Sequence, residues 1–253
     1  MLTRTRWPRP RIVAHRGAGA LAPENTLVAL RLAASLGFAG VEVDARLAAC
    51  GTPVLMHDDT LERTTDGRGR VEAHALEALR RLDAGVWYGN EFAGERVPTL
   101  EAACTLCRAQ GQWMNVEVKP GTDAARTGSV LAAALARHWG EASPAPVLSS
   151  FSDEALAAAG REAPQLPRGL LVDGPGDWSA RARGLGCVAV HVRHDLLDGQ
   201  TVEALHEAGL AVVAWTVNEP GLAAALLDWG VDALVTDELR ELGPGFATLH
   251  GQG

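Results

Sequence analysis

The alternation of strand-like and helix-like segments constrains the fold of this chain more than any other feature. Eight short apolar runs of strand character recur along it, at residues 11–15, 41–47, 114–118, 146–150, 169–172, 187–192, 210–217 and 233–236. Stretches with helical spacing of apolar residues separate most of them, at 27–36, 100–110, 129–139, 153–161, 201–208 and 221–229. Glycines follow several of these stretches, where a helix end favours a left-handed residue. Eight such units in 253 residues predict an α/β fold, a TIM-type (β/α)8 barrel, with a doubly wound open sheet as the alternative.

One interval breaks this rhythm. Residues 48–113 are too many for an ordinary connection between a strand and its helix. The interval contains a short apolar strand at 54–56, a loop at 66–69 and a helical stretch at 71–82. We interpret it as an insertion after the second strand, over one end of the barrel. No repeat or linker divides the chain, so a single domain of residues 1–253 is expected.

Charge and composition exclude several classes of partner. The net charge of −8 argues against nucleic acid, because such binders need a basic face. An aromatic content of 5% and the lack of a basic amphipathic helix argue against stable membrane association. Four arginines near the start are followed by no apolar signal-peptide region, and no uncharged apolar run approaches the ~18 residues of a membrane span. We therefore expect a cytoplasmic protein.

The cysteines fit a reducing compartment. Cys50 and Cys187 are isolated, while Cys104 and Cys107 form one CxxC pair inside the helical stretch 100–110. A structural zinc site needs a second pair of ligands at suitable spacing, and none is evident. Packing of a helix is therefore favoured over a metal or redox role for this pair.

Two of the strand-like runs place charged residues on one face. Glu42 and Asp44 share a face of the second run, and Asn115, Glu117 and Lys119 share a face of the third. The apolar residues between them can pack outward against helices. The charged set then points into the barrel near its C-terminal mouth, where the active sites of TIM barrels lie.

The acidic residues of these two runs predict a metal site. Neighbouring strands lie ~4.8 Å apart, so Glu42, Asp44 and Glu117 are expected to converge. Three carboxylates at close range repel one another unless something neutralises them. Oxygen ligands favour one divalent cation, Mg²⁺ or Ca²⁺, over zinc. The alternative is that each acid pairs with an arginine or faces water.

Two histidines and two cations stand near this predicted cluster. His15 ends the first run, and His57 ends the short strand inside the insertion. A lone histidine at a strand end is usually structural, but two beside a carboxylate cluster indicate acid–base catalysis, because an unperturbed imidazole has a pKa of ~6.5. Arg16 is suited to hold a phosphate by two hydrogen bonds. Lys119 complements an anionic substrate or forms a salt bridge. A metal with these cations describes a site for phosphoryl chemistry.

Two aromatic residues near the strand ends allow two interpretations each, and two polar residues are expected to support the first loop. Trp215 and, more weakly, Phe151 are either a wall of the substrate site or part of the core under the barrel mouth. Glu24 and Asn25 are expected to brace the loop after His15 and to cap the first helix.

Taken in order, the motifs of this chain resemble the glycerophosphodiester phosphodiesterase family. They are His15-Arg16-Gly17, Pro23-Glu24-Asn25-Thr26, Glu42-Val43-Asp44, His57-Asp58, Leu61-Glu62-Arg63-Thr64, Glu117-Val118-Lys119-Pro120, Ser149-Ser150-Phe151, Trp215-Thr216-Val217-Asn218 and Gly230-Val231-Asp232. A single motif is weak, but the ordered set is specific and runs from about residue 11 to about residue 237. The chain is most similar to the compact cytosolic bacterial members that work alongside glycerol-phosphate uptake.

The resemblance implies an activity and a set of roles. Family members hydrolyse glycerophosphodiesters, such as glycerophosphocholine or glycerophosphoethanolamine, to sn-glycerol 3-phosphate and an alcohol. The interval 48–113 matches the family insertion, and the pattern is intact at the catalytic histidines, His15 and His57, and at the metal ligands, Glu42, Asp44 and Glu117. Substrate contacts are expected from Arg16, Lys119, Trp215 and Phe151. Which histidine is the base, whether a cyclic phosphate forms, and whether the chain is a homodimer stay open.

Three other functions compete with this interpretation. A lipid-cleaving barrel enzyme, such as a lysophospholipase D, would act at a membrane surface, which the composition does not favour. A non-catalytic phosphoester-binding protein would lack one of the histidines or acids, and none is missing. A zinc amidohydrolase would carry a His-x-His pair after the first strand, where this chain has His15-Arg16-Gly17.

Overall fold

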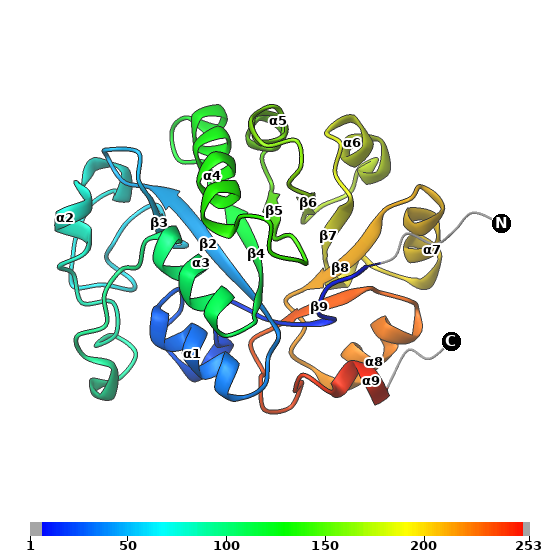
Figure 1. Cartoon of the computed structure of the whole chain (residues 1–253). Helices are drawn as coiled ribbons and strands as arrows, with labels where there is room; N and C mark the ends of the chain where they lie inside the picture. Colours follow the sequence, from blue (N-terminus) through cyan, green and yellow to red (C-terminus); the bar gives the residue numbers. More distant parts are fainter. Residues whose placement is uncertain (1–6, 250–253) are drawn as a thin grey trace.

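The computed structural model describes residues 7–249 as a closed parallel barrel inside a ring of helices (Figure 1). The barrel strands are β1 (Ile12–Ala14), β2 (Gly40–Leu47), β4 (Trp113–Val118), β5 (Val147–Ser150), β6 (Arg168–Val172), β7 (Ala189–Arg193), β8 (Ala211–Trp215) and β9 (Ala233–Thr236). Each pairs in parallel with the next, and β1 pairs with both β9 and β2, which closes the sheet. The predicted TIM-type barrel is confirmed, and the open sheet is wrong.

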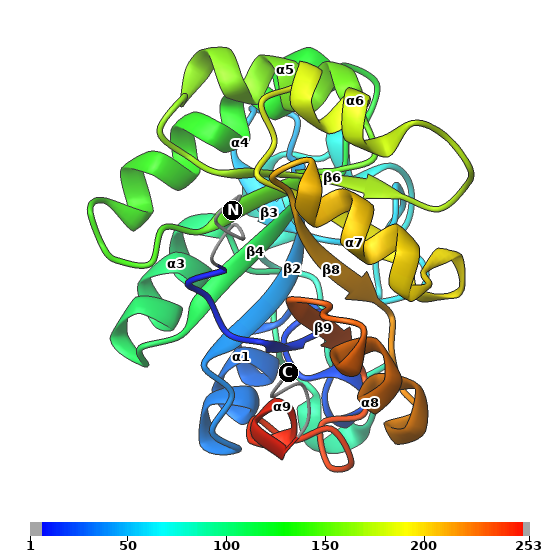
Figure 2. The same ribbon diagram turned by 90° about the vertical axis from the view of Figure 1, so that its right-hand side faces the viewer.

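Helices form the outer layer on all sides of the strands (Figures 1 and 2). They are α1 (Leu27–Ser35), α3 (Leu100–Ala109), α4 (Ala124–Trp139), α5 (Asp153–Glu162), α6 (Trp178–Gly184), α7 (Gly199–Glu207) and α8 (Pro220–Asp228), followed by the one-turn α9 (Phe246–Leu249). The turns η1 (Gly19–Leu21) and η4 (His194–Leu196) are 3₁₀ helices. The short α6 is not evident from apolar spacing, because it buries only Ala182 among the described residues.

The barrel strands present one apolar face to the helices and a mixed face to the interior. Val41, Val43 and Val116 belong to the core that includes helix residues such as Leu30 and Leu131. This confirms the predicted outward packing of β2 and β4. The opposite faces contribute a second apolar cluster, Val13, Trp113, Val147, Val213, Ala233 and Val235. By strand alternation these six residues lie inside the barrel, below the polar strand ends.

The segment between β2 and α3 forms a small layer of its own, coloured cyan in Figure 1. Its strand β3 (Pro53–Leu55) pairs antiparallel with β2, and η2 (Val71–Ala73), α2 (Leu76–Leu79) and η3 (Asn90–Phe92) follow. A separate apolar cluster holds it, made of Ala48, Val54, Met56, Leu61, Val71, Leu79, Ala84 and Val97. The helix expected over 71–82 is wrong, because extended backbone at His74 and Ala75 divides it into two short pieces.

Most helices start with a side-chain cap, and the first one corrects an expectation. Thr26, not Asn25, caps α1, because its hydroxyl accepts from the Ala29 N–H at 3.3 Å. Asn25 instead has a left-handed φ of 57°. Its side chain is engaged elsewhere, as described below.

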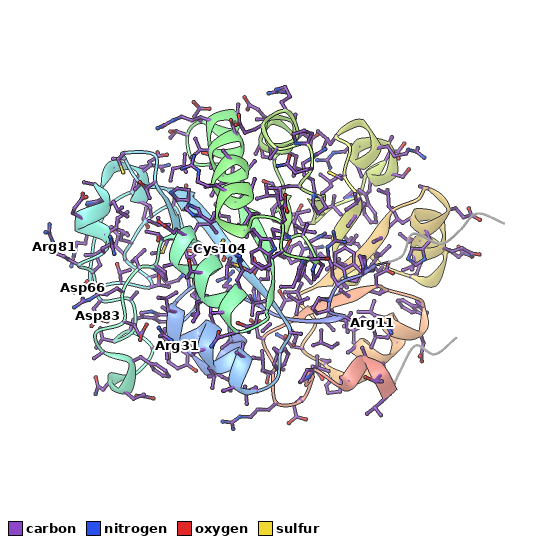
Figure 3. All side chains as sticks on the ribbon, viewed as in Figure 1. Arg11, Arg31, Asp66, Arg81, Asp83 and Cys104 are labelled. Carbon is purple, nitrogen blue, oxygen red and sulfur yellow. The ribbon has the colours of Figure 1, made fainter. Side chains whose placement is uncertain are left out.

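The cysteine pair lies in the core. Cys104, labelled on α3 in Figure 3, and Cys107 are both fully buried in the apolar layer between sheet and helices. All four cysteines are free, and burial raises the pKa of the Cys104 thiol to about 12. These facts support the packing interpretation. In residues 7–249 no helix has the length and apolarity needed to cross a bilayer.

Candidate active site

A cavity of about 210 Å³ lies at the C-terminal ends of the barrel strands. Eight of the nine predicted site residues line it: His15, Arg16, Glu42, His57, Glu117, Lys119, Phe151 and Trp215. The ninth, Asp44, is only 1% exposed and lies behind them against Lys119 and Arg16. The structure therefore brings together residues from β2, β4, β8 and the loops after β1, β3, β4 and β5.

A larger cavity, of about 1020 Å³, lies at the opposite end of the barrel. Its lining comes from the segment before β1, from the C-terminal parts of α3 and α4, and from Gln112 and Trp113 at the start of β4. Among the described residues this lining contains no histidine or carboxylate. Size alone would favour this cavity. Chemistry favours the smaller one, because the ionisable groups gather there.

Three carboxylates meet across β2 and β4. The register pairs Asp44 directly with Glu117, and Glu42 points the same way two residues earlier. One oxygen from each of the three lies within 4.8 Å of the others. Burial and the charge of Asp44 raise the pKa of Glu42 and of Glu117. The cluster therefore resists full ionisation on its own, as the sequence predicted.

Two cationic side chains, Lys119 and Arg16, face the three carboxyl groups. Two positive charges do not balance three ionised carboxylates. The Lys119 ammonium lies 2.5 Å from Glu117 Oε1 and 3.2 Å from Asp44 Oδ1. The Arg16 Nε atom lies 3.5 Å from Asp44 Oδ2. Burial opposes ionisation of Asp44, but these two charges outweigh it and lower its pKa. Arg16 also pairs with Glu24 at 2.9 Å, so its charge is shared.

The donor set fits a hard divalent cation. All three candidate ligands are carboxylate oxygens, and Mg²⁺ and Ca²⁺ bind oxygen at ~2.0–2.6 Å. The spacing of the three oxygens allows one such ion to contact them together. A cation would also relieve the repulsion that raises the pKa values of Glu42 and Glu117.

Asn25 holds Asp44 in place. Its Nδ2 donates to Asp44 Oδ2 at 2.8 Å, and its Oδ1 accepts from the Asp44 backbone N–H at 2.9 Å. The left-handed backbone at Asn25 follows another at Arg16, with φ of 50°. Asparagine tolerates this region better than most residues. The strained loop after β1 thus positions a carboxylate of β2.

We expect Asn25→Ala to lower the free energy of unfolding by about 1–3 kcal/mol, because a buried carboxylate and a buried N–H lose their partner. Urea unfolding of the metal-free protein measures this. Asn25→Gly serves as the matched variant, since glycine removes the same hydrogen bonds without the backbone cost of φ 57°. Wild-type stability in both variants would contradict the positioning role of Asn25.

His15 is oriented by an acid from the other end of the chain. Its Nδ1 lies 2.7 Å from Asp237 Oδ1, and its Nε2 lies 3.9 Å from Glu42 Oε2. Burial disfavours the charged imidazole, but the hydrogen bond with Asp237 and the charge of Glu42 outweigh it and raise the pKa of His15. The Asp237 carboxylate is held in turn by Asn218 Nδ2 at 3.2 Å.

We expect Asp237→Asn to destabilise the protein more at pH 6 than at pH 9. The folded-state pKa of His15 is raised, so its charged form contributes stability below the unfolded pKa of ~6.5, and this is lost as pH rises through the folded value. Replacing the carboxylate removes part of that contribution. Urea unfolding in chelator at several pH values measures the difference between the two proteins. A difference that widens toward pH 9 would contradict this account.

His57 is oriented by its neighbour and by a network of ion pairs. Its Nδ1 lies 2.7 Å from Asp58 Oδ1, and its backbone carbonyl accepts from Arg46 at 2.8 Å. Burial lowers the pKa of His57, and the charge of Asp44 offsets this only in part. Arg63 contacts Asp58 at 2.6 Å and Glu24 at 2.8 Å. Because Glu24 also pairs with Arg16, this network links the loops that carry the two histidines.

The two predicted aromatic residues form one wall of the cavity. Phe151 and Trp215 meet edge to face, with ring centroids 5.5 Å apart. The Trp215 Nε1 donates to the His191 carbonyl at 3.0 Å. Trp215 also packs against the apolar cluster inside the barrel. Trp215 therefore lines the cavity and also packs on the core, and its contact with a substrate stays a prediction. Phe151 is 38% exposed and lies at the cavity mouth.

Asp58, Ser149, His191 and Asp237 belong to the site or support it but were not predicted as site residues, and Asn115 was predicted only to share the inward face of Glu117. Asp58 follows His57 directly, so its position in the sequence could have indicated that it contacts this histidine. Asn115 shares the inward face of Glu117, so strand alternation could have placed it in the cavity. Asp237 meets His15 only through closure of the barrel by β1 and β9, and a local pattern carries no sign of it.

Comparisons with known proteins agree on one family. The model of the glycerophosphoryl diester phosphodiesterase family matches residues 15–241. A glycerophosphodiester phosphodiesterase of Caldanaerobacter subterraneus is 32% identical over 91% of this chain and 95% of its own length. One from Bacillus subtilis is 28% identical over 89% of this chain and 82% of its own.

Solved structures agree with the sequence comparisons. A phosphodiesterase of Oleispira antarctica, determined with the product sn-glycerol 3-phosphate, has a TM-score of 0.86 and 37% identity, and the match covers 91% of this chain and 94% of that one. A glycerophosphodiester phosphodiesterase of Agrobacterium tumefaciens has a TM-score of 0.80 and 29% identity, with coverage of 94% and 99%. This chain therefore belongs to the glycerophosphoryl diester phosphodiesterase family of enzymes.

Proposed function

We propose that this cavity hydrolyses glycerophosphodiesters to sn-glycerol 3-phosphate and an alcohol, with one divalent cation held by Glu42, Asp44 and Glu117. The observation that carries the proposal is the convergence of those three carboxylates with two histidines, each oriented by an acid, at one cavity. The relatives described above support the reaction class. The product named for the Oleispira antarctica structure supports the identity of the phosphate monoester.

The cations of the site bind and stabilise the anionic group. When bound, a divalent cation supplies positive charge for an oxygen of the phosphodiester. Arg16, in the loop after β1 with its left-handed backbone, and Lys119, just after β4, both line the cavity. Their fixed charges stabilise the charge that develops on phosphorus oxygens in the transition state. The Phe151 and Trp215 wall covers the apolar part of the substrate.

The two histidines divide the proton transfers. An attacking oxygen forms a bond to phosphorus while the bond to the leaving alcohol breaks, so one proton must be removed and another delivered. In each histidine an acid holds Nδ1, which leaves Nε2 free to serve as the catalytic nitrogen. Asp237 and Asp58 thus fix the tautomer and the ring orientation of His15 and His57. Such orientation by a carboxylate is a common support for acid–base catalysis.

Choice of substrate is the test of this function. The pure enzyme is incubated with glycerophosphocholine, with glycerophosphoethanolamine and with lysophosphatidylcholine micelles, and release of sn-glycerol 3-phosphate and of choline is measured. Release of sn-glycerol 3-phosphate from the two water-soluble diesters supports the proposal. Choline release from the micelles alone would overturn it in favour of a lysophospholipase D, and no turnover would favour a binding protein. The single domain, the cytoplasmic location and the homodimer stay predictions.

A further inference from the structure

Strand β2 carries a third ionic side chain beyond its two candidate metal ligands. Strand alternation places Arg46 on the same face as Glu42 and Asp44. The short strand β3 pairs antiparallel with this end of β2, and His57 lies two residues after β3 (Figure 1). The Arg46 side chain is 10% exposed and does not line the cavity. Its part in the site is therefore indirect and concerns the loop that follows β3.

The Arg46 guanidinium contacts the first and the last residue of the loop 57–59. Its Nε and its Nη2 both donate to the backbone carbonyl of His57, at 3.0 and 2.8 Å. Its Nη2 also lies 2.6 Å from Asp59 Oδ1. Asp58, the residue between them, contacts His57 Nδ1 at 2.7 Å. The loop that carries the imidazole and its orienting acid is therefore held to β2 at both of its ends.

The geometry of the guanidinium explains why an arginine suits this position. The Nε and Nη2 atoms lie in one rigid plane, so two hydrogen bonds to one carbonyl fix its direction as well as its distance. Arg63 also contacts this loop, through Asp58, but its side chain is 43% exposed, and ion pairs that face water contribute little. Arg46 is therefore the stronger of these two restraints on the loop.

Arg46 joins the loop of His57 to the strand that holds two of the carboxylates. Glu42 and Asp44 precede it on β2. We propose that Arg46 is a positioning residue that sets the place of the His57 ring relative to these two carboxylates. This inference rests on the proposed function, in which His57 transfers a proton at a phosphodiester bound beside them. A misplacement of about 1 Å is enough to slow such a reaction about a hundredfold.

Steady-state kinetics of two Arg46 variants test this role. Arg46→Met removes every donor, and we expect it to lower kcat for glycerophosphocholine about ten- to hundredfold while KM stays within about twofold. Arg46→Lys keeps the charge but loses the planar fork, so its kcat should lie between those of wild type and Arg46→Met. It replaces Arg46→Met if the methionine protein does not fold.

A second arginine that binds backbone carbonyls provides the matched control. Arg168, at the start of β6, donates to the carbonyls of Leu166 and Gly186 at 3.2 and 3.1 Å. Arg168→Met removes a comparable set of hydrogen bonds far from the loop 57–59 and should retain the wild-type kcat.

Coupling to His57 separates positioning from a general loss of structure. In His57→Ala the ring that Arg46 positions is missing, so adding Arg46→Met should lower the remaining kcat by less than about twofold. An equal loss in the wild-type and His57→Ala backgrounds would overturn the positioning role. A raised KM with unchanged kcat in Arg46→Met, or no change in either constant, would overturn it as well.

Hydrogen exchange tests the hold on the loop without catalysis. The Met56 N–H donates to the Asp44 carbonyl and the Val71 N–H to the Asp59 carbonyl, both at 3.0 Å. In chelator these two amides should exchange at least about threefold faster in Arg46→Met than in wild type, whereas the Val217 amide should not change. Unchanged exchange at both would overturn the inference. Faster exchange beside a wild type that does not hydrolyse glycerophosphocholine would instead overturn only the proposed function.

Discussion

Glu42→Ala is expected to lower kcat/KM for glycerophosphocholine by at least about a thousandfold at ordinary Mg²⁺ concentration. The reason is that a Lewis acid supplies several kcal/mol of transition-state stabilisation, and each ~1.4 kcal/mol is a factor of ten. Glu42 is 5% exposed and offers its oxygen to the same point as Asp44 and Glu117. Steady-state release of sn-glycerol 3-phosphate measures the loss. A wild-type rate in this variant would remove Glu42 from the metal site.

Stability measurements separate loss of the metal from loss of the fold. Glu42→Gln keeps the side-chain shape and removes one of three repelling charges, so in chelator it should unfold at or above the wild-type midpoint. Mg²⁺ should raise the midpoint of wild type and much less that of Glu42→Gln, because only binding to the folded state stabilises it. Glu203→Ala, at an exposed position of α7, is the control and should behave as wild type. Equal stabilisation of Glu42→Gln and wild type by Mg²⁺ would contradict ligation by Glu42.

His57→Ala and His15→Ala are each expected to reduce kcat by at least about 100-fold, the usual contribution of one general acid or base. The orienting contacts with Asp58 and Asp237, both at 2.7 Å, give each imidazole a fixed ring position. Single-turnover kinetics with saturating metal measure the chemical step. Metal affinity from the Mg²⁺ dependence of the rate shows whether the cation site is intact.

A matched histidine variant controls for unspecific effects. His138→Ala changes a partly buried histidine of α4, in the outer ring, whose ion-pair partner is Glu101. It should retain the wild-type kcat. Near-normal turnover in either His15→Ala or His57→Ala would refute the shared acid–base scheme. A loss that disappears at high Mg²⁺ would show that the histidine supports the metal and not the proton transfers.

The carboxylate cluster was predictable because it depends on a local rule. Alternation along β2 and β4 places Glu42, Asp44 and Glu117 on inward faces, and parallel pairing of adjacent strands brings them together. The outward burial of Val41 and Val116 follows from the same rule. Eight repeats of strand and helix were enough to indicate a closed barrel.

Other features of the site and the fold depend on contacts between residues far apart in the sequence, which a local sequence pattern does not predict. The bond between His15 and Asp237 joins residues 222 positions apart and exists only because β1 closes the sheet against β9. Asn25 was assigned to the cap of α1 because asparagine before an apolar run favours that role. In the folded protein the Asn25 side chain hydrogen-bonds to Asp44, and Thr26 caps α1. The segment 71–82 has helical spacing, but extended backbone at His74 and Ala75 divides it into two short pieces.

The metal dependence of hydrolysis tests the proposed role of the three carboxylates most directly. The pure enzyme is treated with excess chelator, dialysed, and assayed for release of sn-glycerol 3-phosphate from glycerophosphocholine before and after titration with Mg²⁺ or Ca²⁺. We expect activity to be lost on chelation and one of the two ions to restore it with a saturation curve for a single site. Full activity in excess chelator would contradict the proposed metal site, because Glu42, Asp44 and Glu117 would then serve the reaction without a cation.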